Sequence, residues 1–134
     1  MKTYNLDEVK TSTYYKSFLS DNKGLGILKI RAYTASEALP IKNLYVTVSK
    51  VIDDKNIIFY EGTTNDSGII DNIKLPAPKV IVDNQITPNS TSYKVKTKYM
   101  NQDYSDHTVT IYENILVVQN INVVPNINME NGNL

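Results

Sequence analysis

The sequence contains no cysteine and no tryptophan, a single histidine, and no excess of charge of either sign. Without cysteine, the chain forms no disulfide bonds and has no thiolate nucleophile or thiolate metal ligand. Its fourteen basic and fourteen acidic residues balance, so the basic surplus typical of nucleic-acid-binding domains is missing. We therefore expect no nucleic-acid partner.

Long hydrophobic runs are also missing. No apolar run approaches the roughly 20 residues that span a bilayer. The first residues, MKTYNLDE, lack the apolar segment of a secretory signal peptide. We expect a protein that is made in the cytoplasm without a signal peptide and has no membrane partner.

The chain is rich in residues that favour β-strands, above all Ile, Val and Tyr, with ten Tyr against two Phe. From residue 24 onward the pattern has period two: Leu28, Ile30 and Ala32 point to one side, and Lys29 and Arg31 to the other. Seven segments are predicted as strands: 28–33, 44–49, 57–60, 69–70, 93–99, 107–112 and 116–124. This spacing predicts an all-β fold, a seven-stranded antiparallel β-sandwich of the transthyretin-like or Ig-like type.

Turn residues and prolines divide these strands. The segments 53–56 and 65–68 carry Asp, Asn and Gly in turn patterns. Pro76 and Pro78 are expected to end regular pairing, because proline donates no ladder hydrogen bond. We divide the chain into an N-terminal arm (1–23), a sandwich (24–125) and a polar C-terminal tail (126–134). In the arm, a short helix beginning near Asn5 is followed by an irregular lead-in, since Thr11, Ser12 and Thr13 are weak helix formers.

Three motifs occur in a characteristic order: Pro40-Ile41-x-x-Leu44-x-Val46-x-Val48, then Thr64-Asn65-Asp66-Ser67-Gly68, then Leu75-Pro76-Ala77-Pro78. In this order they resemble the carboxypeptidase-regulatory-like (transthyretin-like) β-sandwich. With the later QNINVVP stretch, the chain is similar to the N-terminal sandwich of clostridial spore cortex-lytic and related peptidoglycan-processing proteins, over about residues 24–125. These motifs specify turns and packing rather than chemistry. The catalytic region that follows the sandwich in such enzymes is not matched, so the resemblance does not imply lytic activity.

Candidates for catalysis and metal binding are few. His107 follows Ser105 and Asp106, but neighbours in a strand point to opposite faces, so the three do not converge as a triad. Asp53 and Asp66 lie in predicted turns without the spacing of an EF-hand. The Gly24-x-Gly26 pair precedes a strand instead of opening a helix, unlike a phosphate-binding loop. We predict no catalytic residue, no metal and no cofactor, and therefore no enzyme.

A row of lysines, Lys94, Lys96 and Lys98, marks one face of the strand at 93–99. The row could contact an anionic polymer or an acidic partner. We favour a structural interpretation, in which these lysines protect an exposed sheet edge from pairing with other chains.

Two functions are open. The first is a non-catalytic structural or adaptor subunit of a larger assembly, such as a phage tail or baseplate particle or a spore layer. Its arms would bind other protein subunits, homo- or hetero-oligomeric, through the aromatic anchors Tyr4, Tyr14, Tyr15 and Phe18. The alternative, which the resemblance suggests, is a module that binds or targets cell-wall peptidoglycan, with Tyr45, Tyr60 and Tyr112 as aromatic platforms for sugar rings.

Overall fold

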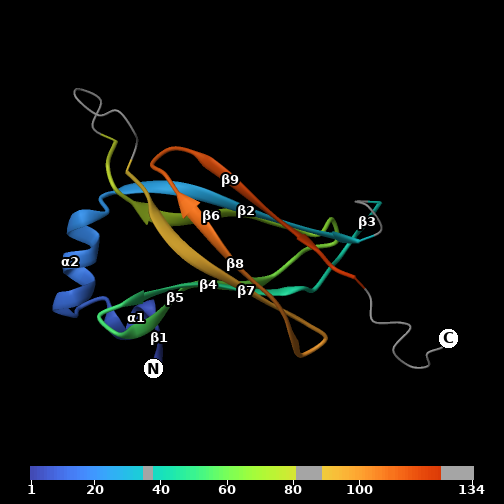
Figure 1. The fold of residues 1–134 in the computed structure, drawn as a ribbon, viewed down its shortest axis with the longest axis horizontal. Coiled ribbons are helices and arrows are strands. Elements are labelled where there is room, and N and C mark those ends of the chain that lie inside the picture. The colour runs from blue at the N-terminus through green and yellow to red at the C-terminus, as the bar shows by residue number, and fades with distance from the viewer. Residues whose placement is uncertain (35–37, 81–88, 125–134) are drawn as a thin grey trace.

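Two β-sheets pack face to face in the computed structural model, which describes residues 1–34, 38–80 and 89–124 (Figure 1). The first sheet has the order β1-β5-β4-β7-β8, with β1 (Thr3–Asn5), β4 (Tyr45–Ile52), β5 (Lys55–Thr63), β7 (Thr91–Tyr99) and β8 (Gln102–Ile111). In the second sheet, the long central strand β2 (Gly24–Thr34) pairs with three others. These are β3 (Leu39–Pro40), β6 (Ile69–Ala77) and β9 (Leu116–Asn122).

The predicted all-β sandwich with an N-terminal arm is confirmed, and each of the seven predicted segments overlaps a strand. Within the described residues there are nine strands, because β1 and β3 add pairings of three and two residues. Such short segments carry no periodic pattern. The pairing also differs from a wholly antiparallel one, since β1 runs parallel to β5 and β9 runs parallel to β2. The period of side chains is the same in both kinds of pairing, so it does not reveal strand direction.

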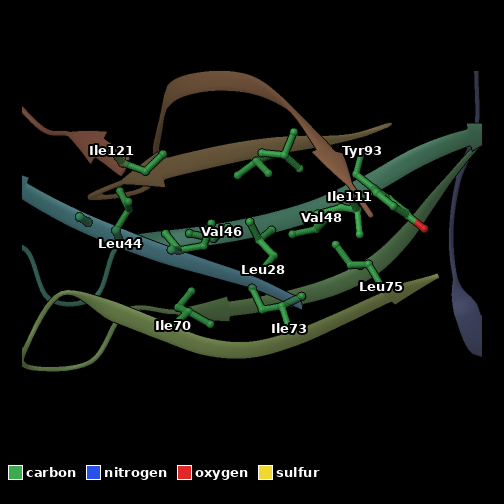
Figure 2. Close-up of a cluster of buried hydrophobic side chains, with 14 of the residues drawn as sticks. Leu28, Leu44, Val46, Val48, Ile70, Ile73, Leu75, Tyr93, Ile111 and Ile121 are labelled. Atoms are coloured by element: carbon green, nitrogen blue, oxygen red, sulfur yellow. The ribbon is translucent and has the colours of Figure 1, made fainter. Parts of the chain in front are cut away.

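The core lies between the sheets and follows the predicted alternation. Leu28 and Ile30 of β2 and Val46 and Val48 of β4 are fully buried. Figure 2 shows such side chains from both sheets pointing toward one another. Tyr93 closes this cluster at one end, and its hydroxyl donates to the carbonyl oxygen of Pro76 at 2.5 Å. Burial of this apolar set is the main favourable term in the folding of the sandwich.

The proline segment departs from the prediction. The strand β6 continues through Pro76 to Ala77, paired with Leu25 and Gly24, so the expectation that these prolines end the pairing is wrong for Pro76. Within the described residues β6 pairs with β2 alone. A strand with one free edge accepts proline, because the missing N–H is not required on that side.

The tight connections use Asn and Asp. Asp53 and Asp54 both have positive φ and form a two-residue hairpin loop between β4 and β5, as predicted. The Asn65 side chain accepts hydrogen bonds from the backbone N–H of Ser67 and of Ile69 and holds the predicted turn that ends at Gly68. Among the described non-glycine residues, those with positive φ are Asn43, Asp53, Asp54, Asn72, Met100, Asn101 and Asn114. All but Met100 belong to the two residue types that adopt this conformation most readily.

The arm is more regular than predicted. A first helix, α1 (Leu6–Val9), begins after Asn5 as expected, and the carboxylate of Glu8 accepts from the Asn5 N–H at 2.8 Å. The prediction of an irregular segment after this helix is wrong, because a second helix, α2 (Thr13–Asp21), follows. The Ser12 hydroxyl caps it by accepting from the Tyr15 N–H. Serine weakens the interior of a helix but stabilises its first turn, and Ser12 therefore begins α2. The predicted tail at 126–134 lies outside the described residues.

Candidate interaction surfaces

All four arm aromatics pack against the sandwich of the same chain, and Tyr15 and Phe18 lie nearest its core. Tyr15 is buried, and its ring centre lies 6.0 Å from that of Phe18. Phe18 lies 5.7 Å from Phe59 of β5, which in turn lies 5.1 Å from Tyr93 in the core. In Figure 1, α2 stands across one end of the sandwich. Tyr15 and Phe18 therefore join the arm to the core, and their contact with a partner stays a prediction.

The other two, Tyr4 and Tyr14, are half-buried. Tyr4 lies in β1 opposite Ile57, and the Tyr14 ring has the Lys55 ammonium nitrogen 4.6 Å from its centre. Contact of these two rings with a partner stays a prediction.

The lysine row lies on an inner strand. Within the described residues β7 pairs with β4 on one side and β8 on the other. The interpretation of Lys94, Lys96 and Lys98 as edge protection is therefore wrong, because β7 has no free edge. Features that protect a sheet edge from pairing lie on β6 instead. They are the exposed Lys74, the proline at position 76 and the positive φ of Asn72.

Part of the row borders a hollow of about 460 Å³ on the outer face of the first sheet. We call it the lysine hollow; its polar lining includes Ser49, Lys50, Ser92, Lys94, Lys96 and Thr108. Among the described residues, neither an acidic side chain nor Lys98 lines it. The Lys50 ammonium donates to the Ser92 carbonyl oxygen at 2.9 Å, and its partial burial lowers the pKa of Lys50. On the rim, the Lys94 ammonium lies 3.8 Å from a carboxylate oxygen of Asp106.

The second sheet has a different outer face. Leu25, Leu116 and Val118 are 50%, 56% and 44% exposed. Together with the half-buried Ile27 they form what we call the aliphatic surface, because Ile27 pairs with Leu116 and the other two lie two residues away on the same face. Lys29 and Lys74 border it, opposite Val118 and Ile27. This surface is not among the features predicted from the sequence. Its only signal is the unbroken ILVV run at 115–118.

The three tyrosines proposed as platforms for sugar rings do not lie together on one surface. Tyr45 pairs with Lys98 at one end of β7, whereas Tyr112 follows the residue that pairs with Thr91 at the other end. Tyr60 packs against the hydrophobic core. The Tyr45 hydroxyl donates to the Glu61 carboxylate, which raises the pKa of Tyr45. Peptidoglycan binding stays a prediction without a common platform from these rings.

The residues considered for catalysis do not form a triad. Ser105 and His107 share a face, with 2.9 Å between the hydroxyl oxygen and Nε2, while Asp106 lies on the opposite face near Lys94. Turn carboxylates pair with lysines, as Asp66 does with Lys42 at 3.4 Å. In the described ranges, no group of three or more His, Cys, Asp or Glu side chains is placed to hold a metal ion. None of the helices in those ranges has the length and apolar character needed to cross a membrane.

No protein-family model and no curated protein matches the chain. Among solved structures, the chain is similar to transthyretin from Sparus aurata, with 15% sequence identity and a TM-score of 0.41. The match covers 72% of this chain and 90% of that transthyretin. The likeness concerns the sandwich fold and carries no conclusion about function.

Proposed function

We propose that this chain is a protein-interaction module: a non-catalytic structural or adaptor subunit that docks on another protein through the aliphatic surface. The observation that supports the proposal is the exposure of Leu25, Leu116 and Val118 side by side on one sheet face. Scattered apolar residues are normal on a protein surface, whereas a contiguous group indicates a contact site. Fully burying an exposed aliphatic side chain contributes about 1.5–3 kcal/mol. These three side chains are about half exposed, so each would gain roughly half of that, and together they supply the centre of a moderate interface.

The border of the aliphatic surface indicates the chemistry of the partner. Lys29 and Lys74 flank the apolar residues, and the nearest carboxylate to Lys29 is the exposed Asp71 at 3.9 Å. Ion pairs at this exposure are weak and easily exchanged. By charge complementarity, the occupant is a different protein subunit with an aliphatic centre and an acidic rim.

The test is a double substitution, Leu116→Asp with Val118→Asp. Both side chains point away from the core, so the variant is expected to fold with the unfolding temperature of the parent. The matched control is Val51→Asp, at a position that is 51% exposed on the other sheet.

The measurement is the native mass of the tagged chain purified from its source cells. We expect a complex of fixed stoichiometry with one identified subunit, which the double variant loses and the Val51→Asp variant keeps. Loss in both variants, or retention in both, would overturn the proposal. A complex made only of copies of this chain would also overturn it, because it would replace the acidic partner by self-association.

The wider setting suggested by the sequence, a phage tail or baseplate particle or a spore layer, stays a prediction. Recovery of the chain inside such a particle would test it, together with the sequence-based link to peptidoglycan-processing proteins.

A further inference from the structure

We propose that the lysine hollow is a binding site for a phosphate group, carried by a small or polymeric ligand. The site is independent of the docking function, because it lies on the outer face of the other sheet. Two features of its lining support the proposal: a buried hydroxyl without a hydrogen-bond partner among the described residues, and a pair of lysines at the rim.

The buried hydroxyl belongs to Ser49. Ser49 lines the hollow and pairs with Lys94, so its side chain points to the same outer face as that of Lys94. Only 3% of the residue is exposed, yet its hydroxyl has no hydrogen-bond partner in the part of the chain that the structure describes. Buried polar groups are nearly always satisfied, so an unsatisfied one requires an explanation. A ligand oxygen in the hollow would accept this hydrogen bond.

Lys50 also borders the hollow, but it follows Ser49 in β4, so its side chain points to the opposite face of the strand, where it pairs with Ile57. Its ammonium group donates to a backbone carbonyl and lies 5.7 Å from the centre of the Tyr93 ring, but it forms no ion pair with a described carboxylate. Partial burial disfavours its charge, as the lowered pKa of Lys50 records. Lys50 is therefore not counted among the groups that would bind an anion in the hollow.

The rim supplies Lys94 and Lys96, two residues apart on the same face of β7. Lys96 forms no ion pair within the described ranges, and Lys94 has only its 3.8 Å contact with the half-exposed Asp106. Two ammonium groups with the hydroxyls of Ser49 and Thr108 match a doubly charged group with several acceptor oxygens. The volume of about 460 Å³ exceeds that of a bare ion and lies in the usual range for small-ligand sites.

The test is a titration of the full chain with inorganic phosphate at constant ionic strength, with chloride as the exchanged anion. Binding is followed from the backbone amide NMR shifts of Ser49, Lys94 and Lys96. We expect saturable shifts with a dissociation constant in the millimolar range. The double substitution Lys94→Gln with Lys96→Gln should weaken binding by about tenfold or more. Asp106→Asn should strengthen it, because it releases Lys94.

Lys98→Gln is the matched control, since Lys98 lies on the same strand and face but does not line the hollow. It should leave the affinity within about twofold. Equal weakening by Lys98→Gln would show a general effect of positive charge and would overturn the site. Shifts that rise linearly without saturation, or that follow chloride equally well, would overturn it too.

Ser49→Ala separates binding from folding. The substitution removes an unsatisfied buried hydroxyl, so the protein should keep or gain thermal stability while its phosphate affinity falls severalfold. Unchanged phosphate affinity in this folded variant would contradict the role of Ser49 in the site.

Discussion

The docking of the arm on the sandwich can be tested at Tyr15. The side chain is 7% exposed and packs with Val9 and Ile57, and its ring centre lies 6.2 Å from that of Phe59. Truncating a buried aromatic residue to alanine typically costs 3–5 kcal/mol. Because Tyr15 covers one end of the core and not its centre, we expect a loss of about 3 kcal/mol for Tyr15→Ala. In a chain of this size, that loss corresponds to a fall of about 10 °C in the unfolding temperature.

The assay is urea unfolding followed by circular dichroism, in the variant and in Tyr15→Phe. The Tyr15 hydroxyl has no hydrogen-bond partner among the described residues, and burial raises the pKa of Tyr15. Removal of the hydroxyl in Tyr15→Phe should therefore change the unfolding free energy by less than about 0.5 kcal/mol. A loss below about 1 kcal/mol in Tyr15→Ala would refute the reasoning. A two-step transition would refute it as well, because the arm would then undock before the sandwich unfolds.

Three further substitutions test local contacts. Gly26→Ala should destabilise the fold by about 2–3 kcal/mol in thermal unfolding, because the new methyl group would overlap the backbone carbonyl oxygen of Tyr112. Asn22→Ala should cost about 1–2 kcal/mol in urea unfolding, since its side chain links the end of α2 to the Thr91 hydroxyl in a buried hydrogen bond. Glu113→Gln should flatten the acid side of the stability curve. The Val80 N–H and the Lys79 ammonium lower the pKa of Glu113, so the carboxylate stabilises the fold above its unfolded pKa of about 4.3 and less as the pH falls through the folded value.

Two of these substitutions have a control variant, and the third has a result that contradicts it. Gly62→Ala should cost less than Gly26→Ala, because the overlapping atoms are the movable end of the Tyr60 side chain. Thr91→Ser keeps the hydroxyl and should cost less than Asn22→Ala. If the unfolding free energies of the parent and of Glu113→Gln fall in parallel with decreasing pH, the stabilising role of that carboxylate is wrong.

The sandwich could be predicted because its strands alternate strictly. Period two alone places Leu28 and Ile30 on the opposite side of their strand from Lys29, and the structure confirms these sides, since Leu28 and Ile30 are buried and Lys29 is half-buried. The turns followed from residue type, since Asp53 and Asn65 occupy conformations that few other residues adopt. These are local properties, and they depend on residues a few positions apart.

Strand order could not be predicted, because it depends on contacts between distant segments. Nothing in the sequence near Lys96 shows that β4 and β8 flank its strand. For the same reason the position of Ser49 in the lysine hollow could not be predicted. In the sequence, Ser49 is one polar residue in an alternating strand. The α2 helix was a different kind of miss, since Ser12 is a common helix cap and could have been recognised as a start signal.

The two proposed sites lie on opposite outer faces of one sandwich, and this arrangement constrains how they interact. The sheets of such a fold pack about 10 Å apart, and the core between them contains Val95 from β7 and Ile121 from β9, both buried. Substitutions separated by more than about 7–10 Å without shared partners usually act additively. Phosphate affinity should therefore be unchanged in the Leu116→Asp and Val118→Asp variant, and docking should be unchanged in Lys96→Gln. If phosphate binding and docking affected one another, the core would need two packing arrangements whose equilibrium both sites shift. If both proposals hold, the independent faces let the module hold a phosphate-bearing ligand and a protein partner at the same time, and so connect them.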